Sequence, residues 1–292
     1  MSITSTEINT QPAIWRHAMG LVGTARELLA APGERVLVIG CGTSAFVAES
    51  LAWLREAAGL GETDAQYASE PRVWRDYTRV IALTRSGTTS EVIDMLASIP
   101  SGVRRVVVTG VLDSPAAALA DDVLLLDFAD EESVVQTRFP TTFLMLARAA
   151  FGENMASVIE QGEAVLAAPL GIEVADIDHF VYLGTGWTYG LAQEAELKIR
   201  EAAQAWSESY PLLDFRHGPL AVAHDRSLVW MIGAADELLA AKIRATGATV
   251  KLGTLDPIVE LVQAQRLAVA VAESRQLNPD LPRHLTRSII LN

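Results

Sequence analysis

The chain has 292 residues, of which 50% are hydrophobic, and its formal net charge is −13 at pH 7. This length predicts about two domains, and the hydrophobic content excludes a largely disordered chain, which requires low hydrophobicity and high charge. Because nucleic acids and anionic membranes attract basic surfaces, the acidic balance disfavours both as partners.

Residues 1–11 lack the basic region and the apolar stretch of a signal peptide. No run of about 18 apolar residues predicts a membrane span. The single cysteine, Cys41, excludes an internal disulfide framework and fits a reducing compartment. We therefore expect a cytoplasmic protein without a membrane partner.

The first predicted elements in the chain recur later in the same order. Residues 36–44 and 180–188 each place a buried-strand pattern before Gly-x-Gly-x and a hydroxyl residue, with Gly184 following Gly40 by 144 positions. Two further predicted strands recur in order, 80–84 with 228–232 and 105–109 with 248–252. This recurrence predicts an internal repeat of one βαβ module.

Helical patterns separate these predicted strands, at 45–58, 90–97 and 189–204. Continuous apolar strands that alternate with amphipathic helices are typical of parallel sheets covered on both faces. Right-handed crossovers then give a doubly wound fold, which binds ligands beyond the carboxyl ends of its strands. We therefore predict an α/β protein with two tandem doubly wound, flavodoxin-like domains.

The predicted organisation is a helical N-terminal segment over 1–32, a first domain over 33–170 and a second domain over 171–292. The boundary falls near 167–178, where proline, glycine and acidic residues gather. The second copy is expected to be shorter, because a long helical stretch over 258–275 follows its third strand. A fourth predicted strand of the first copy, 123–128, has no clear counterpart there.

The turn over 41–46 (CGTSAF) is a candidate anion site, because a glycine-rich turn entering a helix presents unpaired amide N–H groups and the positive end of the helix dipole. Ser44 would add a hydroxyl donor. An equally weighted alternative is a tight turn in which Ser44 caps the helix. A dinucleotide fingerprint is disfavoured, since Ala45 stands where its third glycine is required.

The segment over 84–91 (TRSGTTSE) places Thr84, Ser86, Thr88 and Thr89 around Gly87 at the start of a predicted helix. Small hydroxyls with a permissive glycine can bind phosphate without a lysine. The alternative is a well-capped helix without a ligand. A second glycine-rich turn at the same predicted sheet edge favours a phosphate site.

Glu194, Lys198 and Glu201 share one face of a predicted helix. Taken alone, this spacing favours a surface stripe with an ion pair, whereas a carboxylate facing a cleft could serve as a general base. His217 precedes Gly-Pro in a predicted turn and is a candidate acid–base group. No P-loop motif or Cys/His cluster occurs, so we expect neither a metal nor a cofactor.

At these residues the chain resembles the sugar isomerase (SIS) family in its double-domain form, over nearly its whole length. The motifs that carry the resemblance occur in order: EINTQP near the start, CGTS, the serine/threonine loop, E-x-x-x-K-x-x-E, HGP and PD-x-P-R-x-L-x-x-S. The chain resembles the isomerase half of glucosamine-6-phosphate synthase. Through GTSAF, the RSG loop and FRHGP it is also similar to the tagatose-6-phosphate ketose/aldose isomerase type, described too as galactosamine-6-phosphate deaminase/isomerase.

The resemblance implies roles for particular residues. Glu201 matches the carboxylate that moves a proton between C1 and C2, Lys198 matches a lysine beside it, and His217 matches a ring-opening histidine supplied by a neighbouring subunit. A homodimer with active sites near the subunit interface is therefore implied. The residues expected to bind the substrate phosphate are Ser44, Thr84, Arg85, Ser86 and Thr89. Further candidate substrate contacts are Gly42, Thr43, Thr137, Arg138 and Arg287.

Two departures from the synthase are visible, since Arg287 stands where it has a lysine and residues 136–138 (QTR) replace its S-T-K stretch. No glutaminase domain precedes the repeat, so glutamine-dependent amination is not expected. The resemblance implies an aldose–ketose isomerase that acts on a small sugar phosphate, as an isomerising deaminase of a hexosamine 6-phosphate. Two alternatives remain: a non-catalytic sugar-phosphate sensor and a deglycase of a phosphorylated sugar–amino acid adduct.

Overall fold

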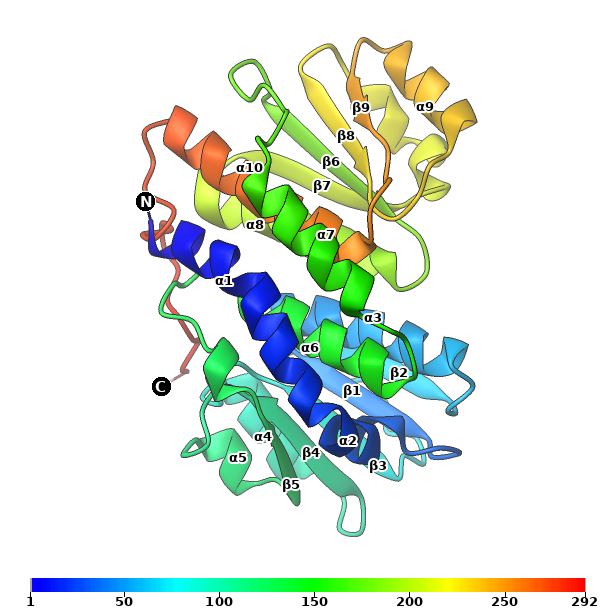
Figure 1. Ribbon diagram of the computed structural model, residues 1–292. Helices are drawn as coiled ribbons and strands as arrows, with labels where there is room; N and C mark the ends of the chain where they lie inside the picture. The colour runs from blue at the N-terminus through cyan, green and yellow to red at the C-terminus, as the bar shows by residue number, and fades with distance from the viewer. Residues whose placement is uncertain (1, 292) are drawn as a thin grey trace. The chain divides into compact units, whose positions relative to one another are not determined.

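A parallel β-sheet forms the centre of each of the two units into which the chain divides (Figure 1). The computed structural model describes residues 2–291. Unit 1 comprises the residues up to Asn9 together with Ser157–Leu285, and unit 2 comprises Thr10–Ala156 together with the residues from Thr286 onward. The predicted α/β class with parallel sheets is confirmed.

The sheet of unit 2 has five parallel strands in the order β2-β1-β3-β4-β5. Every residue of β1 and β3 is buried, because each strand is paired on both sides and helices cover both faces. The strands are β1 (Val36–Gly40), β2 (Thr63–Tyr67), β3 (Arg79–Leu83), β4 (Arg104–Thr109) and β5 (Asp122–Leu125).

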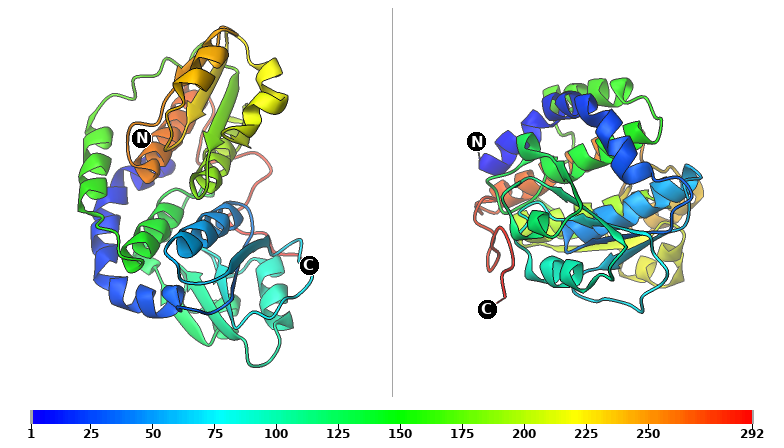
Figure 2. Two further views of the ribbon diagram at one scale, coloured as in Figure 1. Left: turned by 90° about the vertical axis from the view of Figure 1, so that its right-hand side faces the viewer. Right: turned by 90° about the horizontal axis from the view of Figure 1, so that it is seen from below.

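Helices cover the two faces of this sheet. Alternate residues of β1, β3 and β4 pack with α4 and α5 into one apolar cluster, and α3 packs with α6 on the other face (Figure 2, left). Helical turns at η1 (Met19–Leu21), α2 (Val22–Ala25) and η2 (Arg26–Ala30) precede β1. The first helix, α1 (Ile3–Ala18), begins in unit 1 and ends in unit 2. The other helices of unit 2 are α3 (Thr43–Ala57), α4 (Ser90–Ser98), α5 (Pro115–Ala118), η3 (Asp127–Ala129) and α6 (Arg138–Ala150).

The sheet of unit 1 has four parallel strands in the order β7-β6-β8-β9. Alternate residues of β6 and β8 pack with α9 on one face, and α8 packs closely with α10. The strands are β6 (His179–Gly184), β7 (Trp206–Pro211), β8 (Ser227–Met231) and β9 (Thr249–Lys251). The helices are α7 (Ala156–Ala167), α8 (Thr188–Ala203), η4 (Asp214–His217), η5 (Pro219–Val222), α9 (Glu237–Arg244) and α10 (Pro257–Ser274).

The first four strands of unit 2 and the four strands of unit 1 follow the same spatial order, as the internal repeat predicts. All seven predicted strands occur, and β5 has no counterpart among the described residues of unit 1. The sequence analysis missed β2 and β7. Both are edge strands rich in polar residues (TDAQY and WSESYP), so they lack the apolar run on which the other predictions rest.

Each unit joins segments that are far apart in sequence. The Asp280 carboxylate accepts hydrogen bonds of 2.8 Å from the main-chain N–H groups of Ile3 and Thr4. These bonds connect the start of α1 to the rest of unit 1. In unit 2, the Ser288 hydroxyl lies 2.9 Å from Thr88 Oγ1, which ties the last residues to that unit. Hydrogen bonds between residues far apart in sequence therefore connect both chain ends to their units.

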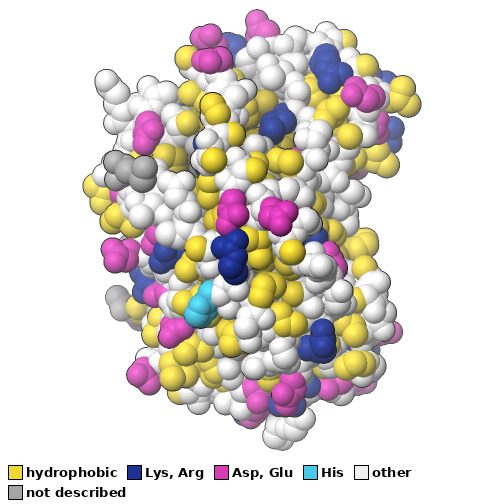
Figure 3. All heavy atoms as spheres, viewed as in Figure 1, with side chains coloured by type: hydrophobic (Ala, Val, Ile, Leu, Met, Phe, Trp, Pro, Cys, Tyr) yellow, Lys and Arg dark blue, Asp and Glu magenta, His cyan; other side chains and the backbone are white. Residues whose placement is uncertain are grey.

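On the face shown in Figure 3, Lys and Arg side chains are scattered among acidic and hydrophobic ones. None of the helices within residues 2–291 is long and apolar enough to cross a membrane.

Candidate functional site

The turns after β1 and β3 meet at the carboxyl edge of the unit 2 sheet, because the two strands are paired neighbours. They form a cavity of about 30 Å³ that has room for only about one or two waters. All five residues predicted to bind phosphate line it. The lining residues are Cys41, Ser44, Leu83, Thr84, Arg85, Ser86, Thr89, Val92, Gln136 and Arg287.

Each of the two turns contains a glycine that its backbone geometry requires. A Cβ atom on Gly40 would lie 2.5 Å from the main-chain carbon of Ser44, so only glycine lets α3 start directly against the end of β1. Gly87 has a φ of +67°, and a Cβ there would lie 2.1 Å from Ser114 Oγ. Substitution of Gly40 would displace the start of α3, and substitution of Gly87 would displace the turn after β3 from Ser114.

Four hydroxyl side chains line the cavity, and we refer to Ser44, Thr84, Ser86 and Thr89 as the hydroxyl cradle. Thr84 is 3% exposed, and its Oγ1 has no hydrogen-bond partner among residues 2–291. Leaving a buried hydroxyl unpaired costs about 1–3 kcal/mol. A polar group placed this way is typical of a site that a ligand completes.

The structure decides against the capping alternatives for both turns. Gly42 is the N-cap of α3, and no side chain caps that helix, so Ser44 is not its cap. Thr89 is the N-cap of α4 by position, but its side chain makes no capping hydrogen bond. The main-chain N–H groups of Ser44 and Ala45 donate within the turn, to Cys41 and Gly42. Those two amides are therefore engaged within the turn, whereas the Thr84 hydroxyl has no partner among residues 2–291.

Arg85 and Arg287 lie at the cavity with their guanidinium groups engaged by the protein. Arg85 is 2% exposed and donates to the main-chain oxygens of Ser133 and Arg287, both at 2.8 Å. Arg287 Nη2 lies 2.5 and 2.6 Å from the two carboxylate oxygens of Asp130, and its Nε donates to Glu131 O. In this structure both arginines hold loops together.

The sequence analysis missed Ser288 as a neighbour of the cradle. Its Oγ lies 3.1 Å from Ser86 Oγ and 2.9 Å from Thr88 Oγ1. The main-chain N–H of Ser90 donates to Ile289 O, and the N–H of Leu291 donates to Ser90 Oγ. The C-terminal segment therefore lies along the start of α4 and against the cradle.

The remaining candidate contacts do not line the cavity. Thr137 is fully buried, and its N–H and hydroxyl both donate to Glu131 Oε1. Arg138 donates to Asp130 O and to Thr10 Oγ1. Gly42 and Thr43 form the start of α3. The residue of the 136–138 stretch that does line the cavity is Gln136, whose buried Oε1 has no partner among residues 2–291.

A second polar group lies on α8 of unit 1. Lys198 Nζ lies 2.6 Å from Glu201 Oε2 and 3.2 Å from Glu194 Oε1. Lys198 is 1% exposed and the Glu194 side chain is fully buried, so the interpretation as a surface stripe is wrong. Glu201 is the more accessible carboxylate, with 16% of its side chain exposed.

Burial alone would lower the pKa of Lys198, but the charges of Glu194 and Glu201 outweigh this effect and raise that pKa above its usual value. Lys198 is therefore an ammonium group at neutral pH. It holds Glu201 by a short charge-assisted hydrogen bond, which fixes the orientation of that carboxylate.

His217 ends η4, the short helical turn that follows β7. Its side chain is exposed, and it forms no hydrogen bond or ion pair with residues 2–291. In the same part of the chain, no group of three or more His, Cys, Asp or Glu side chains is arranged to hold a metal ion.

Comparison with known proteins yields relatives in sequence and in structure. No protein-family model matches the chain. It is 26% identical to the glutamine–fructose-6-phosphate aminotransferase (isomerizing) of Methanothermobacter thermautotrophicus, over 94% of this chain and 54% of that protein. The chain thus spans about half the length of the curated relatives it matches.

Solved structures share the fold over nearly the full chain. The glucosamine-6-phosphate deaminase of Thermotoga maritima matches with a TM-score of 0.83 and 25% identity, covering 99% of this chain and 100% of that one. The tagatose-6-phosphate ketose/aldose isomerase of Escherichia coli matches with a TM-score of 0.81 and 19% identity, covering 100% and 96%. The chain therefore shares its fold, over nearly its full length, with the solved structures of a glucosamine-6-phosphate deaminase and a tagatose-6-phosphate ketose/aldose isomerase.

Proposed function

We propose that the chain is an amino-sugar phosphate aldose–ketose isomerase, acting as an isomerising deaminase of a hexosamine 6-phosphate. The observation that carries this proposal is the hydroxyl cradle, in which the buried Thr84 hydroxyl has no protein partner. The relatives named for glucosamine-6-phosphate deaminase and for fructose-6-phosphate amination support an amino-sugar phosphate as the substrate class.

The proposal assigns phosphate binding to unit 2. A phosphate dianion carries only acceptor oxygens, so Ser44, Thr84, Ser86 and Thr89 can each donate one hydroxyl hydrogen bond. A hydrogen bond to a charged acceptor contributes about 1.5–3 kcal/mol, more than a neutral one. Four such donors bind a dianion without a lysine, which suits a chain whose net charge is −13.

The proposal assigns proton transfer to unit 1. Glu201 removes the proton from C2 of the open-chain sugar, the C1–C2 double bond forms, and O1 takes up a proton. The carboxylic acid then returns the proton to C1, which leaves an imine at C2. Water adds to this imine and ammonia leaves, giving the ketose phosphate. Lys198 holds the Glu201 carboxylate in position before the first step, and His217 is proposed to move the proton in ring opening.

We further propose that each unit is one SIS domain and that the protein is a cytoplasmic homodimer. The shared strand order of the two sheets supports the first part. The exposed position of His217, without a protein partner in residues 2–291, is compatible with the second, since that side chain is available to a neighbouring subunit.

The experiment follows ammonia release and ketose formation together, on a panel of hexose and hexosamine 6-phosphates. Ammonia and ketose from one hexosamine phosphate, lost in Glu201→Gln and kept in the control Glu160→Gln on the exposed face of α7, would support the deaminase. Ketose without ammonia would reduce the function to an isomerase. Stabilisation by a sugar phosphate without turnover would favour the sensor, and turnover of a sugar–amino acid adduct alone would favour the deglycase.

A further inference from the structure

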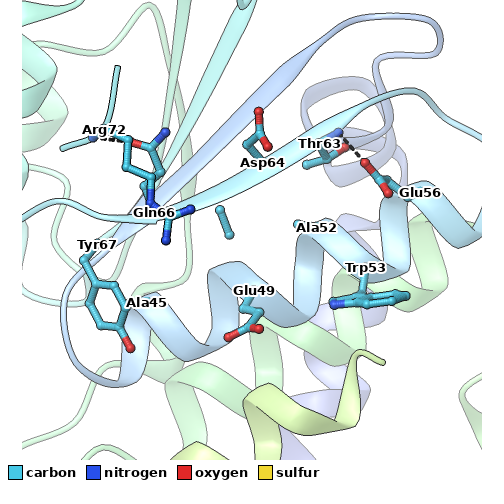
Figure 4. A pocket seen from close by; sticks show the side chains of 11 residues that line it. Ala45, Glu49, Ala52, Trp53, Glu56, Thr63, Asp64, Gln66, Tyr67 and Arg72 are labelled. Carbon is cyan, nitrogen blue, oxygen red and sulfur yellow. Dashed lines mark hydrogen bonds between the residues drawn. The ribbon is translucent and has the colours of Figure 1, made fainter. Parts of the chain in front are cut away.

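A cleft of about 270 Å³ lies between α3 and the edge strand β2 of unit 2 (Figure 4). None of the hydroxyl cradle residues lines it. The lining residues are Ala45, Glu49, Ala52, Trp53, Glu56, Thr63, Asp64, Ala65, Gln66, Tyr67 and Arg72. The cleft is therefore separate from the proposed phosphate site, and the proposed function does not explain it.

Three of the residues that line this cleft are alanines, whose short side chains leave its space open. Ala45, Ala52 and Ala65 reach only to their Cβ atoms, and two of them share the α3 face that carries Glu49 and Trp53. Because β2 is an edge strand, no further strand of the described chain covers this side. Larger residues at the alanine positions would fill the space.

Three carboxylates line the cleft, and two of them have protein partners. Glu56 Oε1 accepts the Thr63 main-chain N–H at 2.8 Å. Asp64 binds Arg75 at 3.0 Å and the Tyr77 hydroxyl at 2.6 Å. These two carboxylates are therefore satisfied within the unit.

Glu49 differs from its two neighbours. Its carboxylate forms no hydrogen bond or ion pair with any of residues 2–291, although the residue is half-buried. Burial raises the pKa of Glu49, and no protein cation opposes the effect. A half-buried carboxylate without a counter-charge is unfavourable, and a bound cation would relieve it.

Two aromatic rings lie beside this carboxylate along the cleft. Trp53 follows Glu49 by one helical turn and is 54% exposed, and Tyr67 ends β2 and is 42% exposed. Figure 4 shows Glu49 and Trp53 on consecutive turns of α3 and Tyr67 beyond the other end of the cleft. The face of an aromatic ring attracts an organic cation, most strongly for tryptophan. Arg72 is the cationic residue at the rim, where its main-chain N–H donates to Gln66 Oε1.

From this juxtaposition we propose that the cleft between α3 and β2 binds a small organic ammonium ion, with the ammonium group on the Glu49 carboxylate and its carbon chain against Trp53. A primary ammonium suits the site best, because it can donate hydrogen bonds to Glu49 while the Trp53 ring contacts its alkyl carbons. This site is independent of the hydroxyl cradle.

The test is calorimetric titration of the full chain with n-butylammonium chloride, alongside n-butanol as the uncharged probe of similar shape. We expect butylammonium to bind in the millimolar range and butanol not to bind measurably. Glu49→Gln, which keeps the shape of the side chain, should weaken binding at least tenfold, and Trp53→Ala should weaken it severalfold. The matched control is Glu27→Gln, an exposed glutamate of the same unit, which should bind like the parent chain.

Three results would overturn the proposal: no binding of butylammonium at tens of millimolar, equal binding of butanol, or unchanged binding by Glu49→Gln. An unaltered melting temperature of Glu49→Gln shows that the variant is folded, so that its loss of binding reports on the cleft. Because the titration uses no sugar phosphate, its outcome is separate from that of the deaminase assay.

Discussion

The Ser288 hydroxyl, near the end of the chain, lies 3.1 Å from the hydroxyl of Ser86 in the turn after β3. It also lies 2.9 Å from Thr88 Oγ1. In the structure Ser288 therefore engages the Ser86 hydroxyl, which the proposed phosphate would use as a hydrogen-bond donor. The small volume of the adjoining cavity, about 30 Å³, agrees with a cradle that is partly filled by its own chain.

We predict that Ser288→Ala tightens the binding of inorganic phosphate by about two- to tenfold. The ligand then no longer has to replace hydrogen bonds that each contribute about 0.5–1.5 kcal/mol. Calorimetric titration with phosphate measures this change. Ser274→Ala, an exposed serine at the end of α10, should leave the affinity unchanged. Weaker binding by Ser288→Ala would instead show that Ser288 helps to hold the phosphate.

A second prediction concerns Lys198, which lies between two carboxylates in the interior of unit 1. Lys198→Met should lower the free energy of unfolding by about 3–5 kcal/mol, because it leaves the buried Glu194 carboxylate without this cation. Lys242→Met on the exposed face of α9 should change it by less than about 0.5 kcal/mol. Urea denaturation measures both.

The double variant Lys198→Met/Glu194→Gln separates charge from packing. If the lost ion pair causes the damage, removing the buried charge as well should restore a large part of the stability. A double variant as unstable as Lys198→Met alone would contradict this explanation and would point to the packing of the lysine side chain instead.

The sequence predicted the elements whose patterns are local. Strands such as β1 and β3 are continuous apolar runs because both of their faces are covered, and the glycine-rich turns follow them directly. The edge strands β2 and β7 are rich in polar residues, so nothing in their composition separates them from loops. The repeat could not supply the missing signal, because β2 and β7 occupy corresponding places in the two sheets and both lack an apolar run.

The candidate site was predictable to a similar extent. The density of hydroxyls around Gly87 pointed to the cradle, but the contact of Ser86 with Ser288 joins residues 202 positions apart and leaves no spacing signal. The spacing of the E-x-x-x-K-x-x-E motif predicts that its charged residues share one helix face, but it does not predict whether that face is buried. Only the packing of α8 with α10 shows that Lys198 and Glu194 are interior residues.

A third prediction concerns Glu260, a carboxylate of α10 that is 1% exposed. Its Oε2 accepts hydrogen bonds from Trp230 Nε1 and the Gly233 main-chain N–H. Its Oε1 accepts hydrogen bonds from the main-chain N–H groups of Thr254 and Leu255. Glu260→Gln should lower the free energy of unfolding by about 1–3 kcal/mol at pH 7. The amide NH₂ group of glutamine would face two N–H donors, so no hydrogen bond could form at that end of the side chain. Chemical denaturation measures the loss, and an unchanged stability would contradict it.

The same residue gives a prediction for pH. Burial raises the pKa of Glu260 above its usual value, although the four N–H donors oppose this effect. The folded state therefore binds the Glu260 proton more tightly than the unfolded state does. The stabilisation from protonated Glu260 is fully present below the unfolded pKa of 4.5 and is lost as pH rises through the folded value.

Glu260→Gln cannot take up this proton, so the difference in unfolding free energy between the parent chain and this variant isolates the effect. We expect that difference to grow in favour of the parent chain as pH falls from 7 toward 4.5. Urea denaturation of both proteins at a series of pH values measures it. A difference that stays constant over this range, or that shrinks toward low pH, would mean that the N–H donors outweigh burial and that the folded-state pKa of Glu260 is not raised.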